Sequence, residues 1–410
     1  MGNKTQKLYL NDVTLQNFKS VVSSFRNFDG KPAIILSATA FYGEAGGQLA
    51  DMGVLEWDGG SACVNDVQIE EGVFFHLIKE LPTGLCPGME VTGCVDMKRR
   101  RDHMQQHTGQ HIISSAFSRM ENMKTISSRL GSRVSTIDID MDQPDWGIAE
   151  RIESHVNQII MENRPIYIRY PESQELSGMN LRRTPKVTED IRVIEIDGFD
   201  LTPCGGTHCR STGEVGLVKI TSLERYKGMA RVGFVAGHRA VDLVQSTSRQ
   251  VREVVRKTEC QLMELPNLIK GIQEELNETR QNLGILRKTY LAQISTRLLL
   301  QYPAGAGKTI ISAVQDNLDA PSRRLLAKLL SNRGDVIAFI VSHDPKTDKW
   351  MLVLECGQDT GFDCHKVFKE FFFPLGGRGG GKPQHVEGFL PGSIDLQSTI
   401  SDFVESVKQS

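Results

Sequence analysis

The chain has 410 residues, of which 48 are Lys or Arg and 50 are Asp or Glu, so its formal net charge is −2. A chain of this length is too long for a single hydrophobic core, and two to four domains are expected. The near-zero net charge excludes a histone-like protein that binds nucleic acid through its overall charge, so a polyanion site must come from a local cluster of basic residues.

The eight cysteines are scattered along the chain without the dense spacing of a disulfide framework. We therefore expect a reducing compartment and mostly free thiols. No apolar run reaches the roughly 18 residues of a membrane helix, and the N-terminal segment MGNKTQKLYLND contains no apolar run of signal length. These features predict a soluble, cytoplasmic protein without a membrane partner.

Residues 1–95 alternate short apolar runs with turn residues. Runs such as PAIILSATAFY and FFHLI are separated by WDGG and LPTGLCPG. This pattern is typical of β-strands joined by tight turns. We expect a β-barrel-like domain in this part of the chain.

Residues 96–240 predict an α+β domain. Asp96 precedes a long helical stretch, Met97 to Met120, and is expected to cap it. There follow alternating residues in RVSTIDIDM, a helical segment DWGIAERIESHVNQIIMENRP, and the strand-like segments IYIRY, IRVIEI and VGLVKI. Strands and helices do not alternate here with the regularity of βαβ units, which favours the α+β class.

Residues 241–302 predict a helical or coiled-coil arm. From Leu262 to Gln293, residues step by three and four in a heptad pattern, and Pro266 is expected to kink or start a helix. The stripe has two interpretations at this point, a long helix packed on its own protein or an intermolecular coil. Residues 303–410 predict a compact α/β domain with a hairpin, VIAFIVSHDPKTDKWMLVLEC, and a glycine-dense segment, GGRGGGKPQ.

Two short motifs contain the residue types that bind metal. In HTGQH, His107 and His111 are four residues apart, so they lie on one face of the predicted helix and can both turn towards one ion. In PCGGTHC, Cys204 and His208 have the same spacing around two glycines, which favour a tight turn. A thiolate and three imidazoles form a tetrahedral donor set that prefers zinc. We expect one Zn²⁺ per chain at these four residues, while His103, one turn earlier, either joins them or faces solvent.

The two motifs resemble the HxxxH and CxxxH motifs of the editing domain of alanyl-tRNA synthetases and of its free-standing relatives, the AlaX proteins. The segment TAFYGEAGGQLADMG (39–53) is similar to the T-x-F-Y-x-x-x-G-G-Q-x-x-D-x-G signature of that family. RYKGMARVGFVAGHRA resembles the stretch that closes the editing domain, and PLGGRGGGKPQ resembles the glycine-rich loop of the C-terminal DHHA1 domain. The matches follow the family's order over nearly the whole chain, although CGGTH also fits the editing domain of threonyl-tRNA synthetases.

The resemblance implies a function. Only 38 residues precede the signature segment, so the expected protein is a trans-editing enzyme of the long AlaX type, which deacylates tRNA but does not charge it. The implied reaction is zinc-dependent hydrolysis of the aminoacyl ester of mischarged Ser-tRNA(Ala), and also of Gly-tRNA(Ala). An inactive, zinc-containing tRNA-binding adaptor and an editing domain of threonyl type stay open as alternatives. Whether the zinc activates water or only positions the substrate is also open.

The resemblance further implies residues that contact the substrate. By alignment with the family, Thr125 is the candidate for recognising the serine hydroxyl by a hydrogen bond, with Ser127 and Ser128 as alternatives. The competing interpretation is that Thr125 is an ordinary residue at the end of a helix or strand.

Gly46, Gly47 and Gln48 have two interpretations. They form a simple β-turn, or they lie close to the editing pocket, as the family motif implies. Gln48 offers both a donor and an acceptor to a terminal adenosine or an aminoacyl group. We expect these three residues to contribute to substrate binding.

Two basic segments are candidates for RNA contact. KRRR (98–101) opens the histidine-bearing helix, where Arg99 and Arg100 either meet backbone phosphate near the acceptor end or lie on a solvated helix face. In GGRGGGKPQ, Arg378 and Lys382 flank glycines whose backbone N–H groups could cradle phosphate as a nest. The expected partner is tRNA(Ala), and a homodimer through the arm or the C-terminal domain is a further alternative.

Overall fold

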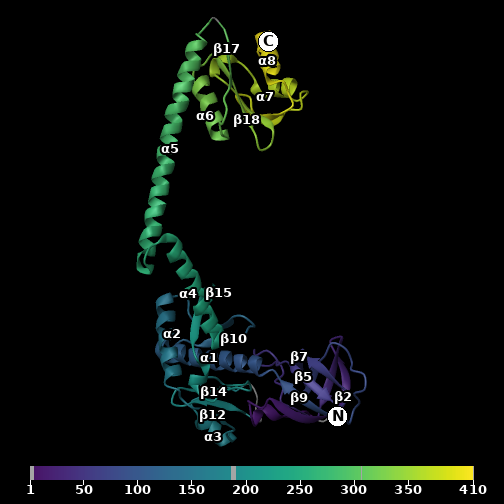
Figure 1. Cartoon of the computed structure of the whole chain (residues 1–410). Helices are drawn as coiled ribbons and strands as arrows, with labels where there is room; N and C mark the ends of the chain where they lie inside the picture. The colour runs from purple at the N-terminus through teal and green to yellow at the C-terminus, as the bar shows by residue number, and fades with distance from the viewer. Residues whose placement is uncertain (1–3, 186–190, 306, 410) are drawn as a thin grey trace. The chain divides into compact units, whose positions relative to one another are not determined.

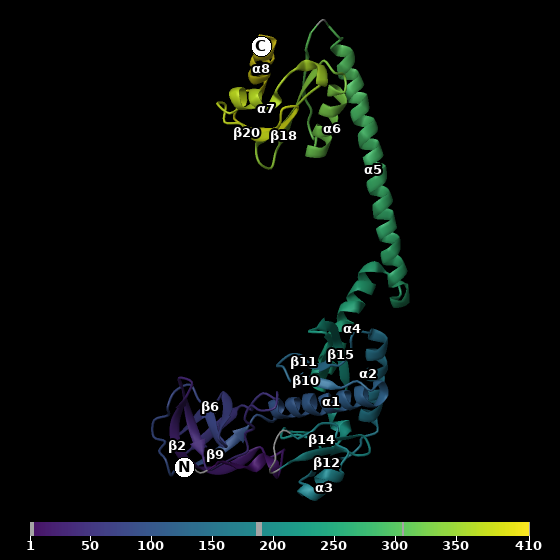
Figure 2. The ribbon, with the colours of Figure 1, turned by 180° about the vertical axis from the view of Figure 1, so that it is seen from behind.

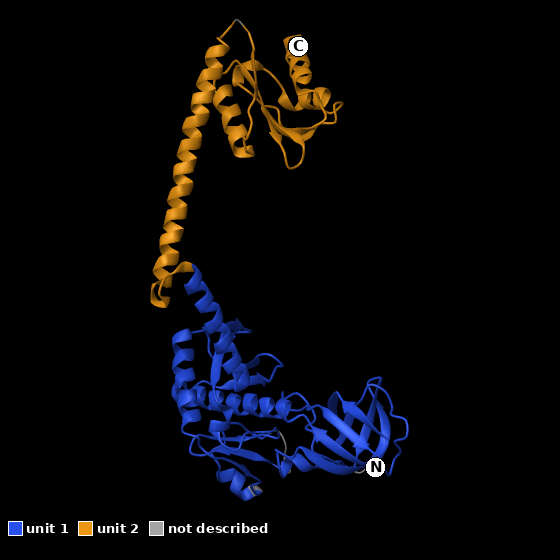
Figure 3. Cartoon of the chain, viewed as in Figure 1, with its two compact units in different colours: residues 1–257 blue, residues 258–410 orange. Residues whose placement is uncertain are grey.

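The computed structural model describes residues 4–185, 191–305 and 307–409. The chain divides into two compact units, residues 1–257 and residues 258–410 (Figure 3). The boundary between them lies inside the predicted arm. The structure contains several sheets and helices of mixed order, so the predicted α+β class is confirmed. No helix in the described part of the chain is long and apolar enough to cross a membrane.

The first unit begins with a seven-stranded antiparallel sheet in the order β6-β5-β9-β2-β3-β8-β7. Its strands are β2 (Asn17–Phe28), β3 (Lys31–Leu36), β5 (Gly53–Trp57), β6 (Gly60–Val64), β7 (Asp66–Glu70), β8 (Val73–Leu77) and β9 (Glu90–Val95), and the short strands β1 (Gln6–Lys7) and β4 (Ala38–Thr39) pair separately. Strand β2 pairs with β9 through residues 17–21 and with β3 through residues 22–28, with a register shift after Val22. Such an irregularity bends a strand, so β2 passes from one half of the sheet to the other around a shared apolar core.

Helix α1 (Met97–Glu121) follows directly and agrees with the predicted helix. The Asp96 side chain accepts hydrogen bonds from two backbone N–H groups of the first turn, and Asn122, with φ of 53°, ends the helix in the left-handed region. Every residue from His103 to Phe117 is buried, although many of them are polar. Buried polar groups need partners, so α1 is the helix along which a functional site is expected.

Two smaller antiparallel sheets belong to the same unit as α1 (Figures 1 and 2). One is β10-β11-β16-β15, made of β10 (Thr125–Arg129), β11 (Ser135–Ile139), β15 (Val218–Tyr226) and β16 (Met229–Ala236). The other is β12-β13-β14, made of β12 (Ile166–Arg169), β13 (Val193–Ile196) and β14 (Asp200–Pro203). Helix α2 (Trp146–Met161) packs on α1 and β15, and residues such as Ile112, Ile152 and Val232 share one core. The unit also contains α3 (Ser173–Gly178) and α4 (His238–Thr258).

The second unit is a five-stranded mixed sheet covered by helices on both faces. The sheet has the order β17-β18-β19-β21-β20, made of β17 (Thr309–Val314), β18 (Val336–Asp344), β19 (Lys349–Cys356), β20 (Arg378–Lys382) and β21 (His385–Pro391). In β18, Ile337 and Phe339 pack with α7 (Cys364–Val367) and α8 (Leu396–Lys408). Ala338 and Ile340 pack on the other face with α6 (Ala320–Ser331) and the end of α5 (Leu265–Gln301). Burial on both faces explains the continuous apolar run of β18.

The predicted arm is divided between α4 in the first unit and α5 in the second. Helix α5 begins next to Pro266, as its position predicts. Leu291, Ile294 and Leu298 near its end pack on the sheet of their own unit. Earlier in the same helix, Ile269, Ile272 and Leu276 are 48%, 52% and 47% exposed. These buried residues lie beside the heptad stripe and not in it, and the stripe itself stays exposed from Ile269 as far as Tyr290, which is 59% exposed. The described residues therefore do not cover the stripe.

The glycine-dense segment is not the phosphate-cradling nest that the sequence suggests. Residues 378–382 form β20, an edge strand in extended conformation that pairs with β21. A Cβ at Gly379 would lie 2.3 Å from the carbonyl oxygen of Glu387, and one at Gly381 would lie 2.0 Å from that of His385. These glycines therefore allow two strands to approach closely, and the nest interpretation is wrong.

Candidate metal centre

Four side chains from two distant segments meet in the first unit. His107 and His111 come from α1, and Cys204 and His208 come from the loop that follows β14. Their ligand atoms all lie within 4.8 Å of one another. Cys204 Sγ is 3.3 Å from His107 Nε2 and 3.3 Å from His208 Nε2. The three histidines are 3–5% exposed and Cys204 is the more accessible member, so the group is a buried site that opens on the side of the thiol.

The protonation states of Cys204 and His208 suit a metal ion. Burial opposes ionisation of the Cys204 thiol, but the neighbouring His107 and His208 outweigh it and hold the pKa of the thiol well below its usual value. Burial, together with His107, holds the pKa of His208 well below its usual value. A thiolate and neutral imidazoles are the forms that bind metal. The donor set therefore fits a transition metal with nitrogen and sulfur ligands.

Gln48 lies directly behind His107. Its Oε1 accepts hydrogen bonds from His107 Nδ1, at 2.8 Å, and from the backbone N–H of Thr207, at 3.1 Å. Its Nε2 donates to Thr207 Oγ1 at 2.8 Å, and the side chain is 0% exposed. With Nδ1 of His107 occupied in this way, Nε2 is left to face the other ligands. The predicted substrate contact through Gln48 is therefore corrected, because its amide is buried and already bonded at both ends.

We expect Gln48→Leu to lower metal affinity roughly 10- to 100-fold, the usual cost of losing a group that orients a metal ligand. Leucine leaves two buried N–H groups, those of His107 and Thr207, without their acceptor. Gln48→Glu is the matched control, because a carboxylate keeps the acceptor and should retain most of the affinity. Zinc titration against a competing chelator measures the difference, and equal affinity of the leucine variant and the wild type would contradict the assigned role.

Gly46 and Gly47 are the central residues of the turn that places Gln48 beside His107. Their φ angles are 59° and 84°, in the left-handed region that glycine adopts without strain. Ala45 and Gln48 exchange two backbone hydrogen bonds across the turn, at 3.0 and 3.2 Å. A Cβ on Gly47 would lie 2.9 Å from the carbonyl oxygen of Ser128. The turn interpretation thus accounts for both glycines, and their predicted contact with substrate stays a prediction.

Asp200 lies beside the second helical ligand, His111. Its Oδ2 lies 3.4 Å from His111 Nδ1, and its Oδ1 accepts a hydrogen bond of 2.7 Å from Arg182 Nε. Burial disfavours the carboxylate, but His111 and Arg182 outweigh that effect and lower the pKa of Asp200. The sequence interpretation does not include this residue. A signal exists nevertheless, because Asp200, Thr202 and Cys204 alternate along one face of β14 and its continuation.

Arg192 holds the loop that contains Cys204. Its Nη1 donates to the carbonyl oxygens of Cys204 and Gly206, both at 2.8 Å. Gly206 approaches the site so closely that a Cβ there would lie 2.2 Å from His107 Cε1. Arg192 therefore fixes a backbone segment in which position 206 has no room for a side chain larger than that of glycine. Sequence reasoning does not single out Arg192.

Thr125 stands at the first position of β10. Its Oγ1 is buried and has no hydrogen-bond partner among the described residues. Ser127, one of the alternatives, donates its hydroxyl to Asp138. Of these two hydroxyls, only that of Thr125 is left for a ligand, although its role in substrate recognition stays a prediction. Arg183 donates to the carbonyl oxygens of Thr125 and Ile126 at 3.3 and 3.2 Å, so a cation also lies at this position.

The predicted RNA contacts differ in accessibility. Arg100 is 0% exposed and bonded to Asp51, so its guanidinium cannot reach phosphate, and this prediction is wrong. Arg99 is half-buried and donates from Nε to the carbonyl oxygen of Ala50 at 2.9 Å. Arg378 and Lys382 are exposed on β20. RNA contact by Arg99, Arg378 and Lys382 stays a prediction.

His103 is separate from the ligand group. It is 2% exposed, and burial lowers its pKa to about 4. The group of four ligands within the described residues does not include it. This agrees with the family motif, which begins at His107 and leaves His103 out of the ligand set, whereas the alternative that His103 faces solvent is wrong because the residue is buried.

Comparison with known proteins adds a family context. Residues 191–232 match the model of the "Threonyl and Alanyl tRNA synthetase second additional domain", and residues 6–99 match that of "tRNA synthetases class II (A)". The chain is 26% identical to the alanyl-tRNA editing protein AlaX-L of Pyrococcus horikoshii, over 93% of this chain and 94% of that protein. It is 29% identical to the alanine–tRNA ligase of Pyrobaculum calidifontis, over 96% of this chain and 43% of that protein. The chain thus spans less than half the length of that ligase.

One solved structure is similar to part of the chain. It is the C-Ala domain of alanyl-tRNA synthetase from Aquifex aeolicus, with 20% identity and a TM-score of 0.23, and it covers 25% of this chain and 95% of that one.

Proposed function

Because the chain resembles a long alanyl-tRNA editing protein of the AlaX type over almost its whole length, we propose that it is a free-standing, zinc-dependent aminoacyl-tRNA deacylase. The proposed substrates are Ser-tRNA(Ala) and Gly-tRNA(Ala), and the bond hydrolysed is the ester between the amino acid and the terminal ribose. The supporting observation is the buried cluster of one thiolate and three imidazoles, whose ligand atoms lie within 4.8 Å of one another. This donor set is typical of zinc.

A bound zinc ion would supply Lewis-acid stabilisation of the ester carbonyl and a coordinated water of lowered pKa. The protein residues decide which coordination position can open. His107 is fixed by Gln48 and His111 faces Asp200, whereas His208 Nδ1 has only Thr108 Oγ1, at 3.5 Å. We therefore expect His208 to be the most loosely held ligand, because His107 has a short hydrogen bond to Gln48 and His111 lies beside a carboxylate, whereas His208 has only a long contact with a hydroxyl.

The test of the proposal is hydrolysis of Ser-, Gly- and Ala-tRNA(Ala) with and without a chelator. The expected result is rapid loss of serine and glycine, slow loss of alanine, and recovery of activity when zinc is returned. A closed shell of four ligands is also typical of structural zinc, so binding of tRNA without hydrolysis would indicate the adaptor. Preferential hydrolysis of Ser-tRNA(Thr) would indicate the threonyl type.

Serine recognition gives a more specific prediction. Serine exceeds alanine by one hydroxyl, so the editing site must recognise that group by a hydrogen bond. We expect Thr125→Val to lose about 1 kcal/mol of this recognition, or roughly a fivefold fall in kcat/KM for Ser-tRNA(Ala) relative to Ala-tRNA(Ala). Ser127→Ala is the control, since that hydroxyl already donates to Asp138. Unchanged discrimination in the valine variant would exclude Thr125.

The same resemblance supports a proposal for the organisation of the chain. Residues 1–95 would form the β-barrel-like domain, 96–240 the editing domain, 241–302 the arm, and 303–410 the DHHA1-like domain that binds tRNA. Arg378 and Lys382, which are exposed on β20, are the proposed tRNA contacts of the last domain.

A further inference from the structure

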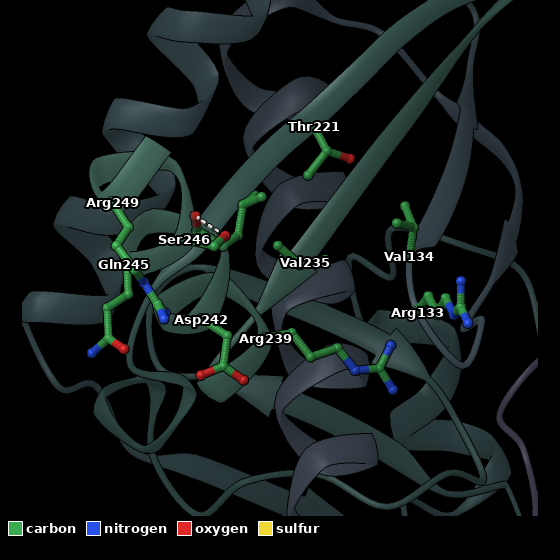
Figure 4. A pocket seen from close by; sticks show the side chains of 10 residues that line it. Arg133, Val134, Thr221, Val235, Arg239, Asp242, Gln245, Ser246 and Arg249 are labelled. Carbon is green, nitrogen blue, oxygen red and sulfur yellow. Dashed lines mark hydrogen bonds between the residues drawn. The ribbon is translucent and has the colours of Figure 1, made fainter. Parts of the chain in front are cut away.

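Two surface clefts of the first unit share one loop. Residues 130–134 connect β10 to β11, and two of them, Arg133 and Val134, line both clefts, while Gly131 and Ser132 line the second cleft only. The first cleft, of about 550 Å³, lies against the start of α4, and Figure 4 shows Arg133 and Arg249 on its opposite sides. The second, of about 520 Å³, lies over β10 and the turn between β15 and β16. The two clefts thus form one surface with the loop in its middle.

This surface is basic, although the whole chain has a net charge of −2. Five arginines line the clefts: Arg129, Arg133, Arg231, Arg239 and Arg249. Two of them are neutralised by carboxylates, Arg231 by Asp138 and Arg239 by Asp102. The other three form no ion pair with the described residues, and Asp242 is the one acid that lines either cleft. The surface therefore keeps an excess of positive charge that suits a polyanion.

An aromatic ring and a hydroxyl group in the clefts also suit RNA. The guanidinium of Arg231 lies 3.4 Å from the centroid of the Tyr226 ring, and this stacked pair offers a flat surface to a base or ribose. Thr221 Oγ1, in the first cleft, is buried and has no hydrogen-bond partner among the described residues. Phosphate contacts in RNA-binding proteins commonly combine arginine with such hydroxyls. An acidic peptide would pair with the arginines but would have no base or ribose to place against the Tyr226–Arg231 pair.

Hydrogen bonds join the loop to α4 and to the segment next to the metal centre. Arg239 Nη1 donates to the carbonyl oxygen of Gly131 at 2.7 Å, while its other nitrogens bind Asp102 of α1. Leu130, the first residue of the loop, donates its N–H to Gly47 at 2.9 Å, next to the Gln48 that orients His107. A polyanion bound at the loop is thus held at a fixed position relative to the buried cluster.

We propose that this surface, centred on Arg133, binds the sugar–phosphate backbone of the acceptor arm of the substrate RNA. The proposal rests on the proposed deacylase function and names the surface along which that RNA approaches the site. Arg129, Arg133 and Arg249 are the phosphate contacts, and the Tyr226–Arg231 pair lies against a sugar or base.

The test uses the full chain with Arg133→Ala, the double variant Arg133→Ala/Arg249→Ala, and Arg26→Ala as control. Arg26 is an exposed cation of β2 in the same unit, without an ion pair among the described residues. Binding of uncharged tRNA(Ala) is measured at several salt concentrations, together with kcat, KM and zinc content. The double variant is expected to bind roughly tenfold or more weakly, with the slope of log K against log salt reduced by about one to two. KM should rise, while kcat and zinc content should stay at wild-type values.

Unchanged tRNA affinity and salt slope in the double variant would overturn the proposal. Loss of affinity for poly-glutamate without loss of affinity for tRNA would also overturn it and assign the surface to an acidic protein. The outcome is separable from that of the proposed function. A wild-type chain that binds tRNA through these arginines but hydrolyses no ester would refute the deacylase alone, whereas active variants with wild-type KM and affinity would refute the surface alone.

Discussion

Replacing Cys204 by alanine is expected to empty the metal centre and abolish deacylation together. The thiolate is the only anionic ligand of the four and lies 3.3 Å from both His107 Nε2 and His208 Nε2. Without it, three neutral imidazoles must hold the ion in a buried site, so affinity falls and a chelator should remove the metal. Because a zinc ion contributes several kcal/mol to such a hydrolysis, the rate should fall by roughly 10²- to 10³-fold or more.

The neighbouring Cys209 provides the matched control. It is also a buried thiol, but it lies outside the group of ligands, and burial raises its pKa to about 12. Cys209→Ala should therefore keep one zinc per chain and near wild-type activity. Metal content by elemental analysis and single-turnover hydrolysis of Ser-tRNA(Ala) measure both variants. Full activity in a metal-free Cys204→Ala protein would refute the zinc assignment.

The ligands themselves can be predicted from the sequence because their spacing is local. A spacing of four residues in a helix places His107 and His111 on one face. Two glycines allow the backbone to turn so that Cys204 and His208 lie close together. The residues that contact the ligands from the side away from the metal are harder to predict from the sequence. Asp200 faces His111 only because β14 lies beside α1, and nothing in the sequence near Gln48 indicates that its amide turns towards His107.

The basic segment KRRR shows the same limit. Its arginines look equivalent in the sequence, yet helix geometry turns Arg100 into the protein while Arg101 stays exposed. Which arginine meets a carboxylate depends on how the N-terminal sheet packs on α1, a contact between residues far apart in the chain. The heptad stripe of α5 is similar, because periodicity predicts the helix but not whether another surface covers the stripe.

The buried pair of Arg100 and Asp51 leads to the largest expected change in stability. Both side chains are 0% exposed. Arg100 Nε donates to Asp51 Oδ2 at 2.9 Å, and its Nη1 and Nη2 donate to the carbonyl oxygens of Val13 and Ala40 at 2.7 and 2.6 Å. We expect Arg100→Met to destabilise the first unit by about 3–5 kcal/mol, because the carboxylate of Asp51 is left buried without its partner.

The measurement needs a signal from the first unit alone, since a chain of two units need not unfold in one step. In a Trp350→Phe background, fluorescence reports only Trp57 and Trp146, which both belong to that unit. Arg101→Met is the matched control, and as an exposed substitution it should change the free energy of unfolding by less than about 0.5 kcal/mol. An Arg100→Met variant as stable as this control would contradict the assignment.

A double variant separates the cost of an unpaired charge from the loss of packing. Arg100→Met/Asp51→Leu removes both charges, so it should recover part of the stability that Arg100→Met loses. The same series links stability to the site. Arg100 lies two helical turns before His107 and joins α1 to the segment that contains Gln48, so loosening this contact should also weaken the hydrogen bond that orients His107. We therefore expect zinc affinity to fall in Arg100→Met and to follow the recovery of stability in the double variant.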